Sequence, residues 1–150
     1  MADASPLPLV IELARKNRDS IARSAATAQR LVDDNQAQLA SLERYHADYL
    51  ARSARTPESD MAALMNFQAF ISRLELAIGQ QRATLDHHRG RAIALKGEHT
   101  RASIKVKSLE ALAAAREAEL RRAAQRVERK LEDEHASRMV RQGSLLGSAH

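Results

Sequence analysis

Histidine, carboxylate and hydroxyl side chains could support catalysis or hold a metal, but their spacing in this chain does not group them. His87 and His88 are adjacent, so on a helix their side chains point about 100° apart and cannot chelate one ion together. The run Glu132–His135 spreads around a helix in the same way. The chain has no cysteine and no glycine-rich phosphate-binding motif, and its serines and threonines have no partnered base. We therefore expect a non-enzymatic protein without catalytic residues, metal or cofactor.

The aromatic residues are the other group whose types and positions suggest a function. Tyr45 and Tyr49 precede Pro57, and Phe67 and Phe70 follow it. Tyr49 and Phe67 occupy positions of the apolar stripes described next and are expected to pack. Tyr45 and Phe70 lie just beside those stripes. Because exposed aromatic side chains often anchor a partner, both are candidate binding residues, with packing as the alternative.

Small and apolar residues recur at alternating spacings of three and four along much of the chain. A repeat of about 3.5 residues keeps one face of a long helix toward a partner helix, which is the signature of a coiled coil. Neither stripe can be buried by its own helix, so each needs a covering partner. The longer stripe runs over Leu64, Phe67, Ile71, Leu74, Ile78, Gln81, Leu85, His88, Ala92, Leu95, His99, Ala102, Val106, Leu109, Ala113, Arg116, Leu120, Ala123 and Val127. The shorter one runs over Ile11, Ala14, Arg18, Ile21, Ala25, Ala28, Val32, Asn35, Leu39, Leu42, His46 and Tyr49.

One strong helix breaker, Pro57, separates the two stripes. Proline cannot continue a helix, and it biases the preceding residue away from the helical conformation. We predict helices over about 6–54 and 60–142, joined by a turn over about 55–60. The predicted fold is all-α, a long antiparallel two-helix coiled-coil hairpin whose second helix is longer than the first, forming a single domain over 1–142.

The ends of these helices carry local signals. Ser5 is suited to cap the first helix, and Thr56 or Ser59 to cap the second. Beyond the predicted stop, residues 143–150 begin with Gly143 and are expected to form a disordered tail.

Folding the chain about its turn brings the two stripes together. The resulting register places Ala28 near Leu85 and Asn35 near Ile78. The first helix is then used up near residue 107, and the rest of the second helix has no partner within the chain. Such an uncovered surface either marks a binding site or is covered by a second copy of the chain, and both readings stay open. Its apolar residues are Leu109, Leu112, Leu120, Val127 and Leu131.

The composition agrees with long helices. Aromatic residues make up 3% of the 150 residues and charged residues 29%, with a net charge of +5. The basic residues alternate with acids, which predicts ion pairs along a solvated helix face rather than a nucleic-acid site. Gly79, Gly90 and Gly97 are expected to weaken the second helix, each by about 1 kcal/mol relative to alanine. With no signal peptide and no apolar run of about 20 residues, we expect a cytoplasmic protein.

Three segments of the chain carry a family resemblance. LERYHADYLAR, NFQAFISRLELAIGQQRATL and KVKSLEALAAAREAELRRAAQRVERKLEDEHASR, in this order around one proline turn, resemble the FliJ family of the bacterial flagellar export apparatus. The resemblance implies a non-enzymatic stalk that works in type III protein export, flagellum biogenesis, motility and chemotaxis. Its implied location is the cytoplasm, at the cytoplasmic face of the inner membrane.

The resemblance also implies partners. Family members bind the hexameric export ATPase ring, regulating it as a central stalk, contact the cytoplasmic domain of the export gate protein, and escort export chaperones. The gate-binding face carries over onto Tyr45, Tyr49, Phe70, Leu74, Ala77 and Gln81. For the ATPase ring we select residues of the uncovered stripe and its charges, namely Leu120, Arg126, Val127 and Leu131.

Two other functions fit the same pattern. One is the equivalent stalk of a virulence-type secretion system. The other is a coiled-coil oligomerisation scaffold with no ATPase partner.

Overall fold

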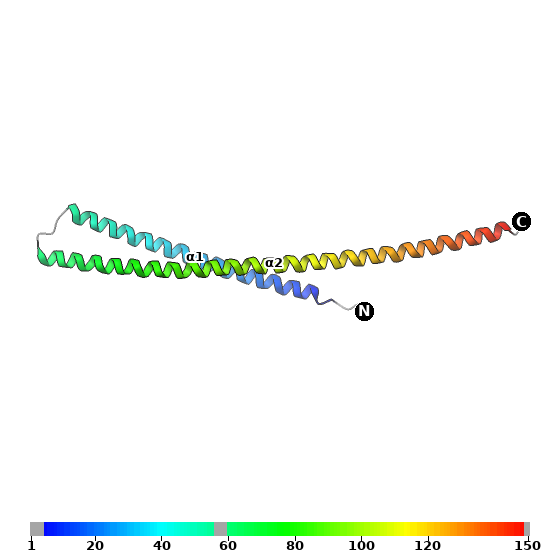
Figure 1. The fold of residues 1–150 in the computed structure, drawn as a ribbon, viewed down its shortest axis with the longest axis horizontal. Helices are drawn as coiled ribbons and strands as arrows, with labels where there is room; N and C mark the ends of the chain where they lie inside the picture. The colour runs from blue at the N-terminus through cyan, green and yellow to red at the C-terminus, as the bar shows by residue number, and fades with distance from the viewer. Residues whose placement is uncertain (1–4, 56–59, 149–150) are drawn as a thin grey trace. The chain divides into compact units, whose positions relative to one another are not determined.

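The computed structural model describes residues 5–55 and 60–148, and these residues form two long helices. Helix α1 spans Leu7–Arg55 and helix α2 spans Met61–Ser148 (Figure 1). No strand occurs within the described ranges. The two helices pack against each other and the second is the longer, which confirms the predicted fold class.

The chain divides into two compact units. One consists of Leu13–Ile104 and holds most of α1 with the first half of α2. The other combines Met1–Glu12 with Lys105–His150. Each unit therefore contains a piece of both helices.

Both helices begin at a side chain that accepts a backbone hydrogen bond, because the first amides of a helix have no partner within it. The hydroxyl of Ser5 accepts from the amide of Leu7 at 3.2 Å, as predicted. The carboxylate of Asp60 accepts from the amide of Ala62 at 3.2 Å and so caps α2. The predicted caps Thr56 and Ser59 lie outside the described residues.

The stripe predicted for the first helix is the covered face of α1. Every position of that stripe from Ile11 to Tyr49 is buried or half-buried. Ile11, Ala14, Ala28 and Val32 are between 3% and 8% exposed. The apolar pattern alone therefore identified the packed face of this helix.

The stripe of α2 is covered over only part of its length. Its positions from Phe67 to Ala113 are buried or half-buried, and the Val106 side chain is fully buried. Beyond Ala113, Leu120 is 71% exposed and Val127 is 60% exposed. The stripe positions of α2 therefore become exposed a few residues after the point at which α1 was predicted to run out.

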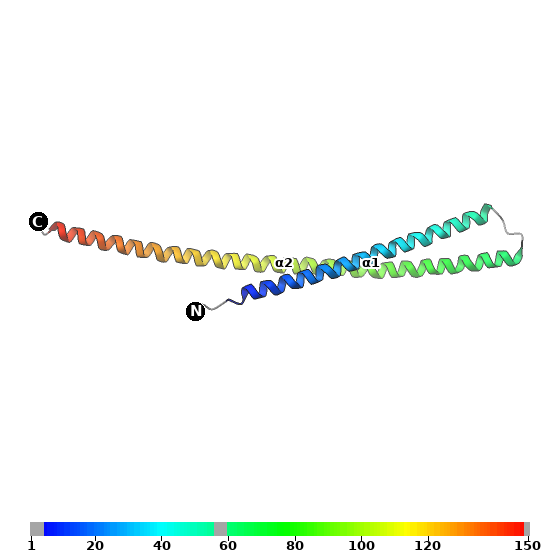
Figure 2. The same cartoon turned by 180° about the vertical axis from the view of Figure 1, so that it is seen from behind.

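In the unit Leu13–Ile104 the helices run side by side in opposite directions. Figures 1 and 2 show this for the cyan part of α1 and the green part of α2 from two opposite sides. Tyr49 stacks on Phe67, and Asn35 is hydrogen-bonded to Gln81. The same number of residues separates the two contacts along α1 and along α2, so the pairing of the helices keeps one register between them. The predicted register placed Asn35 near Ile78. In the structure Asn35 contacts Gln81, which is the next position of the α2 stripe.

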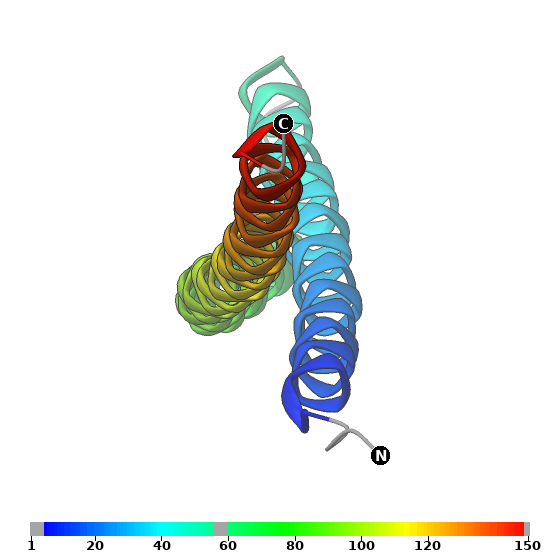
Figure 3. The ribbon, with the colours of Figure 1, turned by 90° about the vertical axis from the view of Figure 1, so that its right-hand side faces the viewer.

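The second helix does not end at residue 142 as predicted, and residues 149–150 of the predicted tail lie outside the described residues. Helix α2 continues to Ser148, and its ribbon is unbroken in the end-on view of Figure 3. Gly143 and Gly147 have ordinary helical backbone angles, since no described glycine has a positive φ. A glycine costs a helix only about 1 kcal/mol relative to alanine, and the neighbouring Leu145 and Leu146 favour the helix.

Candidate partner-binding sites

The four aromatic residues form one cluster between α1 and α2. The Tyr49 ring lies 5.1 Å from the Phe67 ring, nearly parallel to it, and 4.6 Å from the Phe70 ring, measured between centroids. The Tyr45 ring lies 6.3 Å from Tyr49 and 6.0 Å from Phe70, which it meets edge-on. These distances are those of favourable aromatic pairs. The cluster therefore packs the helices together and also presents aromatic surface.

Exposure separates the members of this cluster. Tyr45 is 52% exposed, whereas Tyr49, Phe67 and Phe70 are half-buried. Tyr45 is thus the member most available to a partner. Phe70 touches both tyrosines, so its ring supports the position of Tyr45 as well as contributing surface.

The remaining residues of the predicted gate-binding face continue from Phe70 along one side of α2. Leu74 is only 8% exposed and belongs to the core between the helices. Ala77 and Gln81 are half-buried. The structure therefore brings all six predicted residues to one stretch of the helix pair, but the side chain of Leu74 is almost fully covered by the chain itself.

Gln81 is held by polar groups of α1. Its side-chain amide donates to the Asn35 side-chain oxygen at 2.8 Å and to the Gln38 side-chain oxygen at 3.2 Å. The Asn35 amide nitrogen in turn donates to the backbone oxygen of Leu31 at 2.7 Å. We call Asn35, Gln38 and Gln81 the polar clamp. It is a polar layer in an otherwise largely apolar stretch of the stripe.

A shallow groove connects the polar clamp with the aromatic cluster. Its volume is about 640 Å³, and Tyr45 and Gln81 both line it. The other lining residues, which the sequence analysis did not select, are Ala37, Gln38, Ser41 and Leu42. All of them except Leu42 lie beside the α1 stripe. The predicted register, combined with the position of Tyr45, could have indicated these residues as neighbours of a partner-binding surface.

An arginine–glutamate ion pair and a histidine–glutamate hydrogen bond also bridge the two helices in this stretch. Arg82 lies 3.0 Å from Glu43, and His46 lies 3.3 Å from Glu75, measured between nitrogen and oxygen. The alternating charges predicted pairs along single helices, whereas these two contacts join α1 to α2. Both are partly exposed, so each adds little stability but favours the native pairing of the helices.

The residues selected for the ATPase ring lie on the solvated part of α2. Leu120, Val127 and Leu131 are 71%, 60% and 61% exposed. They follow one another at spacings of seven and four, which places them on one face of a helix. Within the described residues no other segment covers this face.

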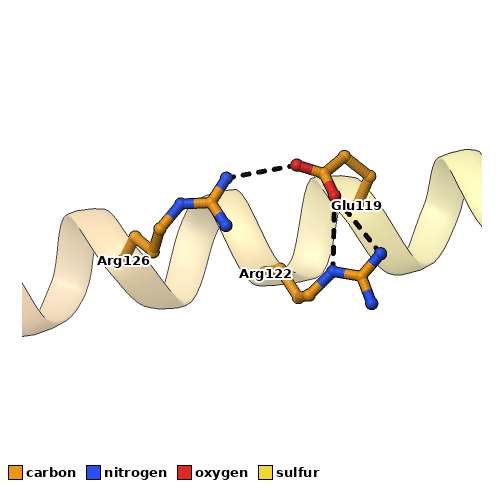
Figure 4. Close-up of polar contacts among 3 residues, drawn as sticks. All are labelled: Glu119, Arg122 and Arg126. Atoms are coloured by element: carbon orange, nitrogen blue, oxygen red, sulfur yellow. Dashed lines mark hydrogen bonds and ion pairs between the residues drawn. The ribbon is translucent and has the colours of Figure 1, made fainter.

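Arginine side chains beside this face are held by one carboxylate. Glu119 accepts from Arg122 through one oxygen and from Arg126 through the other, each at 3.2 Å (Figure 4). Arg122 is one turn away from Glu119 and Arg126 two turns away. These pairs agree with the interpretation of the alternating charges as a solvated face. They also fix two guanidinium groups next to Leu120 and Val127.

A family comparison bears on all of these residues. The model of the flagellar FliJ protein family matches residues 3–144. The chain belongs to the FliJ family. No match was found among curated proteins or among solved structures.

Membership of the FliJ family makes this chain a flagellar export protein of the helical stalk type, in a family of non-enzymatic structural proteins. All ten residues selected for partner binding lie within the matched range. Among the residues that the structure describes, no group of three or more metal-ligating side chains could hold an ion. Neither described helix contains a stretch that is apolar enough over a sufficient length to cross a membrane.

Proposed function

We propose that this protein is a stalk that joins the hexameric export ATPase to the export gate of the flagellum. The observation that carries the proposal is the change along α2 from a covered stripe to an exposed one. Leu120, Val127 and Leu131 keep the stripe's spacing but are at least 60% exposed. Exposure of such an apolar face to water is unfavourable, so a partner surface that covers it binds with a favourable free energy.

The exposed face suits the central opening of a ring. A single helix is about 10–12 Å wide with its side chains and can enter an opening that a globular domain cannot. Arg126, held toward Glu119, adds charge beside the apolar residues. An asymmetric helix inside a ring of six subunits contacts each of them differently, and so can favour one conformational state of a subunit over another.

The gate-binding surface in this proposal is the aromatic cluster with its groove. Tyr45 offers exposed aromatic area, and Gln81 lines the same groove. Tyr49, Phe70, Leu74 and Ala77 act mainly by fixing the two helices beneath that surface. In this function the protein works at the cytoplasmic face of the inner membrane and also meets export chaperones.

The test adds the purified protein to its cognate export ATPase. We expect ATP hydrolysis and the hexamer fraction to rise, and the double variant Leu120→Gln/Val127→Gln to lose most of that rise. Leu76→Gln is the matched control, because Leu76 is 63% exposed but lies in the other unit. If neither hydrolysis nor hexamer fraction responds to the unaltered protein, the stalk proposal is wrong.

The same experiment separates the two alternatives. An oligomerisation scaffold would cover Leu120 and Val127 with a second copy of the chain, and would sediment as a stable homo-oligomer at micromolar concentration in the absence of the ATPase. A virulence-type stalk would stimulate the ATPase of that secretion system in preference to the flagellar one.

A further inference from the structure

A second groove lies between α1 and α2, away from the aromatic cluster. Its volume is about 340 Å³, and an arginine from each helix lines it: Arg23 from α1 and Arg91 from α2. Ala28 and Leu31 supply apolar surface, and Leu31 is 39% exposed. The hydroxyl-bearing Ser24 and Thr27 complete the lining.

The segments on both sides of this groove lack acidic residues. Residues 20–31 contain two arginines and no aspartate or glutamate. Residues 87–97 contain two arginines and one lysine, again without an acid, and begin with two histidines. We call these two segments the basic belt. Around Glu119, by contrast, acids and bases alternate and pair with each other.

Within the described residues, the two groove arginines are not held by a carboxylate, in contrast to three arginines that are. Arg18, Arg82 and Arg122 each have a carboxylate within 3.2 Å. Neither the Arg23 nor the Arg91 guanidinium has an ion pair or hydrogen bond to a described residue. Both side chains are exposed, and the like charges repel each other across the groove. An anionic group bound between them would remove that repulsion and accept paired hydrogen bonds from each guanidinium.

We propose that the basic belt is a binding site for an acidic segment of a partner protein, whose carboxylates contact Arg23 and Arg91. The apolar floor formed by Ala28 and Leu31 fits an apolar side chain of such a segment. Nucleic acid fits less well, because binding of single strands relies on stacking and the belt contains no tyrosine, phenylalanine or tryptophan. A membrane surface fits less well too, because a narrow groove cannot be filled by a flat layer of headgroups. This site is separate from the surfaces assigned to the ATPase and the gate.

The test measures binding of the full chain to a short fluorescein-labelled peptide in which leucines are flanked by glutamates. A peptide with glutamines in place of the glutamates serves as the ligand control. We expect the glutamate peptide to bind and the double variant Arg23→Gln/Arg91→Gln to bind it about tenfold or more weakly, since each lost guanidinium–carboxylate pair weakens binding. The matched variant control is Arg52→Gln/Arg73→Gln, which removes one exposed arginine from each helix outside the belt.

Each other outcome overturns the proposal. Equal weakening in the two double variants would mean that only net charge matters. Absence of binding to the glutamate peptide by the unaltered chain would remove the site. Tighter binding to a DNA oligonucleotide or to phosphatidylserine vesicles, lost in Arg23→Gln/Arg91→Gln, would assign the belt to another class of ligand. Far-UV circular dichroism of every variant verifies that the helices are retained.

Discussion

The side-chain amide of Gln81 donates a 2.8 Å hydrogen bond to the side-chain oxygen of Asn35, across the packed stripe from α2 to α1. The stripe on both sides of this pair is rich in small and aliphatic residues, which tolerate many neighbours. An amide in such a stripe is satisfied only when it faces another polar group. A shift of one helix by a heptad would part the Gln81 amide from the Asn35 side-chain oxygen, and losing this hydrogen bond costs about 1 kcal/mol. The polar clamp therefore selects one register.

The first prediction concerns this register. The double variant Asn35→Leu/Gln81→Leu should raise the free energy of unfolding by about 1 kcal/mol, because a half-buried polar pair between helices is often less stabilising than an apolar one. It should also populate a shifted register. Urea denaturation measures the stability, and the matched control Gln36→Leu/Gln80→Leu changes two exposed glutamines instead.

The register itself can be read by thiol cross-linking, since the chain has no cysteine of its own. Cysteines at Glu43 and Arg82, which are ion-paired at 3.0 Å, report the native register. Cysteines at Glu43 and Arg89 report a shift of one heptad. Cross-linking of the native pair alone in the leucine variant would show that the polar clamp does not set the register.

The second prediction separates binding from packing in the aromatic cluster. Tyr45→Ala should leave the free energy of unfolding within about 1 kcal/mol of the unaltered protein, because half of the side chain is already exposed. Phe70→Ala should cost about 1–2 kcal/mol, because the Phe70 ring packs on both tyrosines. Both should weaken binding to the gate domain while leaving the helical circular dichroism signal nearly intact.

Leu50→Ala is the control for this pair, because Leu50 is 42% exposed on the same helix and lies outside the cluster. A loss of helical signal in Phe70→Ala would mean that Phe70 only packs. Unchanged gate binding in Tyr45→Ala would remove the aromatic surface from the proposed site.

The third prediction concerns the glycines of α2. A Cβ atom built on Gly79 or Gly90 meets no other atom within 4 Å. Each glycine has helical backbone angles, so alanine should raise the free energy of unfolding by about 0.5–1 kcal/mol per site, measured by urea denaturation. A decrease in either variant would indicate that the glycine is needed for close approach or bending.

The fourth prediction concerns Glu119. Its carboxylate holds Arg122 and Arg126, and no other helix packs on this part of α2 among the described residues. Glu119→Gln should therefore accelerate amide hydrogen exchange around these residues about twofold at low salt, consistent with a few tenths of a kcal/mol for each exposed pair. Glu117→Gln is the control, since its contact with Arg121 is longer, at 4.0 Å. Equal acceleration in both variants would show that Glu119 has no special role.

The fold could be predicted closely from the spacing of apolar residues and from one proline. The α1 stripe from Ile11 to Tyr49 and the α2 stripe from Phe67 to Ala113 are the covered faces of the helices. Such a pattern succeeds because a two-helix coil has only one face to bury. Helix ends were less predictable: the Asp60 cap was not anticipated, and the glycines after residue 142 did not stop α2.

The candidate sites were less predictable than the fold. Sequence spacing placed both Tyr45 and Phe70 beside the packed stripes; Tyr45 is 52% exposed, whereas Phe70 is half-buried. The stripe placed Leu74 on the packed face, where it is 8% exposed. Spacing did not show that Gln81 is held by Asn35, because that contact depends on the partner helix. The groove lined by Ser41 and Gln38 likewise exists only once the two helices are packed.

The pairing of the chain's beginning with the late part of α2 has a consequence for biosynthesis. Ile11 and Val106 are buried in the same compact unit, although most of the chain separates them. On the ribosome, α1 is complete before any of its covering residues has been made. The helix pair must therefore close from the turn outward, with the shortest loops first. The first turn of α1 is then among the last parts of the helix to be covered, and its apolar face stays open to other proteins in the meantime.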